Sequence, residues 1–206
     1  GVEIIRRAWT EDRFDFHGKR YNLTGVAVQP KPIQQPHPPI WLGASRGSAI
    51  ERVAKMADGF HYVGAPSAYK AYEEAMKRNG RDPRSIPVFD SRDFWCAEDS
   101  EQAWQEAREH LFYSSSNYAR WGAQAAEADG HPVTGEPPAT PEEMRERAGT
   151  MLFVGDPGEI VEMFRKRQAD APIDGTIMRV PPGMDHSKVL KQMELIASEV
   201  MPHFAD

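Results

Sequence analysis

Apolar and polar positions alternate along the chain with the periods of strands and helices in turn. The clearest unit spans Pro36–Gly64, where the short apolar run Ile40–Leu42 predicts a buried strand. Ser48 and Glu51 form the capping box of a following helix. The buried stripe of that helix recurs at helical spacing and consists of Ile50, Val53, Ala54 and Ala57. The run 60–64 predicts the next strand, so this stretch is one strand–helix–strand unit.

The same alternation continues to the end of the chain. The apolar runs 86–96 and 175–180 predict two more strands, and the caps Asp99 and Asp185 after these runs predict two helices. Asp156 before Pro157 predicts a further helix start, whereas 129–141 is rich in glycine and proline and predicts a mobile loop. Four strands, each followed by a helix, indicate a parallel α/β sheet.

The first 35 residues follow a different pattern. Residues 1–10 predict the end of an amphipathic helix, 14–23 predict a β-hairpin around a glycine turn, and the prolines of 29–39 predict an extended connector. Because the chain opens in what reads as the middle of a helix, we expect an upstream portion. We therefore divide a single domain into residues 1–35 and the strand–helix units of 36–206.

Length narrows the fold class, and composition narrows the function. An open doubly wound sheet fits the four units, but so does half of a (β/α)8 barrel, since 206 residues fall short of the about 250 of a whole barrel. A net charge of −6 argues against nucleic-acid binding. Cys96 is the one cysteine, which excludes an internal disulfide and a cysteine-built zinc site.

Other functional classes are disfavoured by what the sequence lacks. The seven histidines lack metal-ligand spacing, so we expect no metal. The sequence has no apolar run long enough for a membrane span and no leader pattern. A cytoplasmic location is therefore expected.

The Gly/Ser loop after the first of these strands is the main candidate for ligand binding. Its small residues allow a ligand to approach the backbone, and the start of the following helix favours an anion. The alternative is that Ser45 only turns the chain and Ser48 only caps the helix. A second set of candidates consists of charged residues within predicted strands: Asp90, Arg92, Asp93 and Arg179. These residues are expected either to line a substrate pocket or to form structural ion pairs.

Four pieces of sequence resemble, in the same order, bacterial luciferase-like flavin-dependent monooxygenases and their coenzyme F420-dependent relatives. They are PKPIQQPHPPIWLGASRGSAIERVAKMADGF, FWCAEDSEQAWQEA, FVGDPGEIVEMF and DGTIMRVPPGMDHSKVLKQMELIASEVMPHF. The resemblance spans nearly the whole chain and implies a TIM (β/α)8 barrel that binds a reduced flavin at the C-terminal ends of its strands. This chain would supply strands five to eight. The first four strands, and with them the catalytic residues, would be absent.

The resemblance also implies binding residues. The loop that meets the flavin phosphate corresponds to Gly43, Ala44, Ser45, Arg46, Gly47 and Ser48, and Ala44 stands where bacterial luciferase has an acidic residue. The strand end on which part of the isoalloxazine ring rests corresponds to Tyr62, Val63 and Gly64. An aromatic residue at a strand end can equally be core. By strand alternation His61 would point to the opposite face.

The function implied is oxygenation of a small organic substrate by molecular oxygen with reduced FMN. One alternative is hydride transfer with coenzyme F420. A second is an inactive half-barrel that self-associates without a cofactor, and a third is a phosphate-binding α/β enzyme of another family. The implied partners are a separate flavin reductase and either further copies of the chain or a missing N-terminal half, with no nucleic acid and no membrane.

Overall fold

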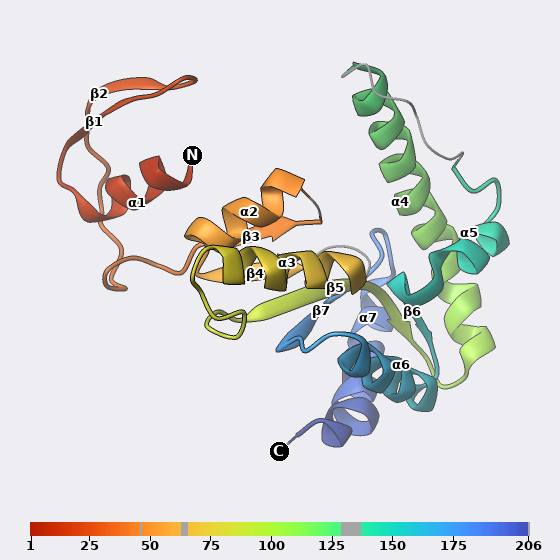
Figure 1. Ribbon diagram of the computed structural model, residues 1–206. Coiled ribbons are helices and arrows are strands. Elements are labelled where there is room, and N and C mark those ends of the chain that lie inside the picture. The colour runs from red at the N-terminus through yellow and green to blue at the C-terminus, as the bar shows by residue number, and fades with distance from the viewer. Residues whose placement is uncertain (46, 63–65, 129–136, 206) are drawn as a thin grey trace. The chain divides into compact units, whose positions relative to one another are not determined.

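The computed structural model describes residues 1–45, 47–62, 66–128 and 137–205. It comprises two compact units, Gly1–Phe89 and Asp90–Asp206, and its elements are drawn in Figure 1. No helix within the described ranges combines the length and the apolar character that a membrane crossing requires.

The first unit opens with the predicted helix and hairpin, and both are confirmed. Helix α1 spans Val2–Thr10, and strands β1 (Phe14–His17) and β2 (Asn22–Val26) pair antiparallel beside it (Figure 1). Lys31 lies on the connector after the hairpin, and its ammonium group donates to the carbonyl groups at Ala8 and Glu11, the first at 2.8 Å. The connector is therefore anchored to the end of α1.

The predicted strand–helix–strand unit is also confirmed. Strand β3 (Trp41–Ala44), helix α2 (Gly47–Met56) and strand β4 (Gly59–Tyr62) follow one another, and β3 pairs parallel with β4. Helix α3 (Pro66–Arg78) comes next. The Phe60 N–H donates to the Pro87 carbonyl at 2.9 Å, which joins β4 to the chain entering the next strand.

The predicted capping box of α2 is wrong. The helix begins at Gly47, one residue earlier than expected, and Gly47 has a φ of 56°, a left-handed conformation that favours glycine. Ser48 therefore lies inside the first turn. The Glu51 carboxylate instead accepts hydrogen bonds from Arg78 at 2.5 Å and Asn79 at 3.2 Å. Long-range partners have replaced the local partner that the sequence pattern offered.

The second unit is built on strand β5 (Val88–Cys96), whose first two residues belong to the first unit. Strand β6 (Leu152–Gly155) pairs with it in parallel, from Asp93↔Leu152 to Cys96↔Gly155, and strand β7 (Gly175–Arg179) also pairs with it. The remaining elements are helical: α4 (Ser100–Ala128), α5 (Pro141–Ala148), α6 (Pro157–Asp170), α7 (His186–Leu195), and the short turns Gly149–Met151, Ile196–Val200 and Met201–His203.

Two features of this unit differ from the prediction or extend it. The sequence pattern at Phe153 indicated only a helix start, but the residues before Asp156 form β6. The predicted cap itself is confirmed, because the Asp156 carboxylate accepts from the Glu159 N–H at 2.9 Å. Most of the predicted loop 129–141 lies outside the described residues. The parallel α/β class is confirmed, and the described strands do not close into a barrel.

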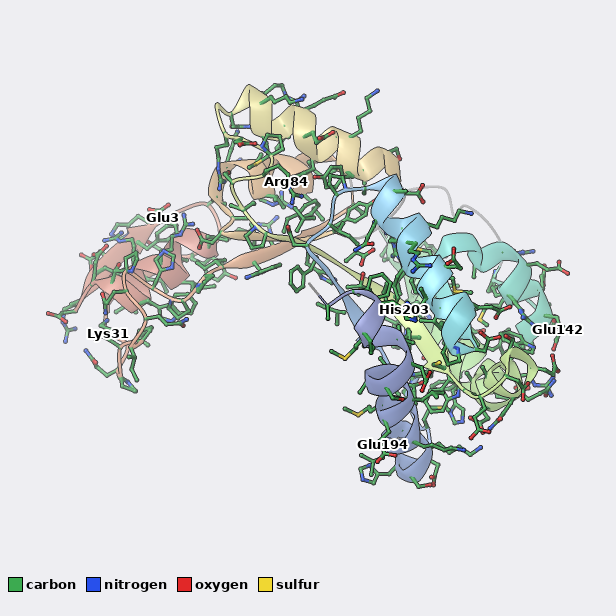
Figure 2. All side chains as sticks on the ribbon, turned by 90° about the horizontal axis from the view of Figure 1, so that it is seen from below. Glu3, Lys31, Arg84, Glu142, Glu194 and His203 are labelled. Carbon is green, nitrogen blue, oxygen red and sulfur yellow. The ribbon has the colours of Figure 1, made fainter. Side chains whose placement is uncertain are left out.

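Strand alternation divides the core of the second unit between the two faces of β5 and β6. Phe94 and Phe153 belong to a cluster with α6 and the C-terminal segment. Trp95 and Val154 belong to a cluster with α4 and α5 on the opposite face. Both faces of this part of the sheet are therefore covered. Figure 2 labels Glu142 on α5, and Glu194 and His203 near the C-terminus.

Candidate functional site

The predicted phosphate loop lies at the C-terminal end of β3 in the first unit. Ser45, Gly47 and Ser48 are exposed, whereas Ala44 is buried, and Arg46 lies outside the described residues. The first turn of α2 carries no acidic residue, and its N–H groups have no partners within the helix. The loop therefore presents hydroxyl groups and a helix start to solvent.

Arg52 adds a positive charge to this loop. Its guanidinium Nη1 donates to the Ser48 hydroxyl at 3.4 Å, and Arg52 is itself exposed. The sequence analysis did not single out Arg52, although its spacing of four residues from Ser48 places both side chains on one face of the helix. Hydroxyl groups, helix N–H groups and a guanidinium are donors that suit a phosphate group.

The strand end that was expected to meet the isoalloxazine ring has a different arrangement. The Tyr62 side chain is fully buried, with ring centroids 6.0 Å from those of Phe60 on β4 and Tyr69 on α3. Its ring is therefore core, and only its backbone is left for a cofactor contact. Val63 and Gly64 lie outside the described residues.

The face of β3 and β4 opposite Tyr62 carries more accessible groups. His61 is half-buried there and lies in register with Gly43, which is exposed. A Cβ atom at Gly43 would lie 3.9 Å from the His61 Nδ1 atom, an ordinary contact distance, so the two residues are direct neighbours on this face. Strand alternation correctly predicted that His61 points away from Tyr62. It did not predict that the face carrying His61 is the accessible one.

Two of the charged strand residues of the second unit form a buried network. Both Arg92 and Arg167 lie 2.7 Å from the Asp90 Oδ2 atom, and the Thr176 hydroxyl donates to its Oδ1 at 2.6 Å. The two guanidinium groups and the carboxylate are at most 3% exposed. The expectation that Asp90 and Arg92 line a substrate pocket is corrected, because they face α6, and the alternative of a structural ion pair holds. Buried charges of this kind require partners.

Asp93 and Arg179 form a second ion pair, which is accessible. The Asp93 Oδ1 and Arg179 Nη2 atoms lie 3.1 Å apart, and the side chains are 42% and 43% exposed. Asp93 is one position out of phase with Asp90 and Arg92, so it points to the opposite face of β5. Partial burial raises the pKa of the Asp93 carboxyl, and Arg179 and Arg92 oppose that shift. Of the charged strand residues named in the sequence analysis, Asp93 and Arg179 are therefore the accessible ones, and their part in a substrate pocket stays a prediction.

Cys96 is the single cysteine of the sequence. It is buried at the end of β5, and burial raises the pKa of its thiol to about 12. Such a thiol is protonated and unreactive at neutral pH. Within the described ranges, no cluster of histidine, cysteine or acidic residues has the arrangement of a metal site.

Comparison with known proteins identifies relatives of the chain. The sequence profile of the luciferase-like monooxygenases matches residues 1–174. Over 59 residues, 29% of this chain and 16% of the relative, the sequence is 34% identical to an FMNH2-dependent dimethylsulfone monooxygenase from Pseudomonas putida.

Solved structures share the fold. Monooxygenase RslO1 from Streptomyces bottropensis superimposes with a TM-score of 0.71 at 21% identity, over 99% of this chain and 60% of its own. The coenzyme F420-dependent tetrahydromethanopterin reductase from Methanopyrus kandleri gives a TM-score of 0.71 at 19% identity, over 98% of this chain and 61% of its own. The oxygenating constituent of 3,6-diketocamphane monooxygenase from Pseudomonas putida, in complex with FMN, gives 0.68 at 18% identity, over 98% and 61%. The chain thus spans about 60% of the length of these structures.

Proposed function

Because the chain belongs to the luciferase-like monooxygenase family, we propose that the functional protein oxygenates a small organic substrate with molecular oxygen and reduced FMN. The observation that carries this proposal is the donor set at the start of α2, where Ser48 and Arg52 are joined. The FMNH2-dependent relative and the FMN-bound structure support the cofactor assignment. The family match also contradicts the alternative of an α/β enzyme from another family.

The residues of the first unit would hold the phosphate end of FMN. The Ser45 and Ser48 hydroxyls and the first N–H groups of α2 would donate to the phosphate oxygens, and Arg52 would balance their charge. The isoalloxazine ring would rest on the face that carries Gly43 and His61, because the Tyr62 ring lies on the other face. When bound, reduced FMN would supply the electrons for oxygen activation.

Hydride transfer with coenzyme F420 is the second candidate. It is favoured by F420-dependent structures with the same fold, among them the reductase from Methanopyrus kandleri. Both cofactors carry a phosphate group on the side chain of the ring, so the donors at the start of α2 serve either one. The relative affinities for FMN and F420 therefore distinguish the two functions.

Titration with FMN, riboflavin and F420, followed by cofactor fluorescence, tests both candidates. We expect FMN to bind about ten- to a hundredfold more tightly than riboflavin, because hydrogen bonds to a charged group contribute about 1.5–3 kcal/mol. Tighter binding of F420 than of FMN would favour hydride transfer. Equal affinities for FMN and riboflavin would contradict a phosphate site at the start of α2.

We also propose that a second copy of this chain covers an apolar groove in the second unit. The groove has a volume of about 630 Å³ and lies between α6, β7 and the C-terminal segment, with Phe164, Met178 and Val200 in its lining. Met178 and Met201 in this lining are exposed, at 39% and 59%. An apolar surface of this extent marks an interaction site. We further propose a separate flavin reductase as a partner. The proposed location is the cytoplasm.

Sedimentation velocity of the purified 206-residue chain tests this covering. We expect a concentration-dependent dimer or larger species, which Met178→Glu should shift towards the monomer because it places a charge in the groove. The exposed Ala125→Glu on α4 is the matched control and should leave the distribution unchanged. A compact monomer at all concentrations would contradict self-association through this groove.

A further inference from the structure

The second unit contains a cavity of about 270 Å³ beside the Asp93–Arg179 ion pair. It lies between β5, α4 and α5, and Figure 1 shows α5 next to α4. Asp93 contributes the carboxylate wall, Ser115 projects from α4, and Met144 and Arg147 project from α5. All of these residues belong to one compact unit.

The cavity is smaller than a typical drug-sized pocket, which has a volume of about 300–1,000 Å³. Its lining is largely apolar and includes Leu111, Met144 and Met151. Methionine side chains are flexible and polarisable, and they adapt to small ligands of varied shape. Size and lining together favour a small organic molecule with an apolar body.

The charges around the cavity are already balanced. Asp93 is paired with Arg179, and Arg147 is paired with Glu143 within α5. A charged ligand would have to break one of these pairs or remain unpaired, and both cost free energy. The partial burial that raises the pKa of Asp93 also disfavours an anionic ligand, because it already makes negative charge unfavourable at this position.

We propose that this cavity binds a small, neutral, mainly apolar organic molecule with one polar atom that hydrogen-bonds to Ser115 or Arg147. The role of this cavity as the substrate pocket rests on the proposed function. Asp93 and Arg179 then act as positioning residues that hold the polar edge of the cavity. The compound class is that of short ketones, alcohols or similar neutral molecules.

The test is methyl NMR of the chain labelled at its methionine ε-methyl groups, titrated with 2-pentanone, butyrate and n-butylammonium. We expect 2-pentanone to shift the Met144 and Met151 signals saturably and to leave Met201 unchanged, because Met201 lines the other groove. The two charged probes should bind at least about tenfold more weakly, because the cavity offers them no unpaired counter-charge.

Substitutions within the cavity separate binding from non-specific effects. Ala148→Leu narrows the cavity from α5 and should weaken 2-pentanone binding at least about tenfold, the usual effect of one extra group in a small pocket. Ser115→Leu, from α4, is the second variant should the first fail to fold. The exposed Ala125→Leu on α4 is the control and should bind as the original chain does.

The outcomes are decisive for this site and distinct from those for the cofactor. The proposal is overturned by unsaturable shifts, by equal affinities for neutral and charged probes, or by unchanged binding in folded Ala148→Leu and Ser115→Leu. FMN binding without 2-pentanone binding would remove this inference alone. Binding of 2-pentanone without binding of FMN would keep the cavity as a ligand site and remove the proposed flavin function.

Discussion

Replacing Asp90 by asparagine is expected to lower the free energy of unfolding by about 3–5 kcal/mol, because it removes the negative charge that two buried guanidinium groups share. Arg92 and Arg167 both lie 2.7 Å from the same carboxylate oxygen, and none of the three side chains is more than 3% exposed. The loss is measured by urea unfolding followed by circular dichroism, with the slope of the transition checked for two-state behaviour.

Asp93→Asn is the matched control on the same strand. Its ion pair with Arg179 is similar in length, at 3.1 Å, but about 42% exposed, so the change should alter stability by no more than about 1 kcal/mol. Burial raises the pKa of Asp93, which means that the folded state already disfavours its ionised form. Equal losses for the Asp90 and Asp93 variants would show that burial does not set the contribution of these pairs.

Replacing Ser48 by glutamate is expected to weaken FMN binding by about 100-fold or more, since like charges placed together cost several kcal/mol. Ser48 lies in the first turn of α2, next to the Arg52 guanidinium. A glutamate there would place its carboxylate where the phosphate is proposed to bind. The helix itself should not be harmed, because an acidic residue in the first turn interacts favourably with the helix dipole.

The controls for this variant are a neutral substitution and a ligand without phosphate. Ser48→Gln introduces a side chain of nearly the same size as glutamate but without its charge. This variant should lose much less affinity for FMN than Ser48→Glu does. Riboflavin should bind Ser48→Glu and the original chain alike. An unchanged FMN affinity in Ser48→Glu, at unchanged helix content, would place the phosphate elsewhere.

Local signals determined much of the secondary structure. The alternation of apolar runs and helical stripes predicted β3, α2, β4 and the helix after β5, because backbone period and side-chain direction are properties of short segments. The caps at Asp156 and Asp185 were predicted for the same reason, since a cap needs only a side chain and the N–H groups two or three residues later. The family resemblance rested on such segments in order.

Where local and long-range partners compete, the sequence pattern was insufficient. Glu51 had the spacing of a capping box, but its carboxylate binds Arg78 and Asn79, which are distant in sequence. Strand β6 was missed because its four residues precede a strong helix start and gain their pairing from β5, which is distant in sequence. Neither arrangement is encoded in the spacing of neighbouring residues.

The sequence by itself determined that Tyr62 and His61 point to opposite faces of one strand, and that Asp90 and Asp93 do so on another. The tertiary structure decided which face in each pair is covered, because that depends on where α3 and α6 pack. It placed Tyr62 and Asp90 in the interior and left His61 and Asp93 accessible. Alternation is a property of the strand, whereas burial is a property of the helices that pack on it.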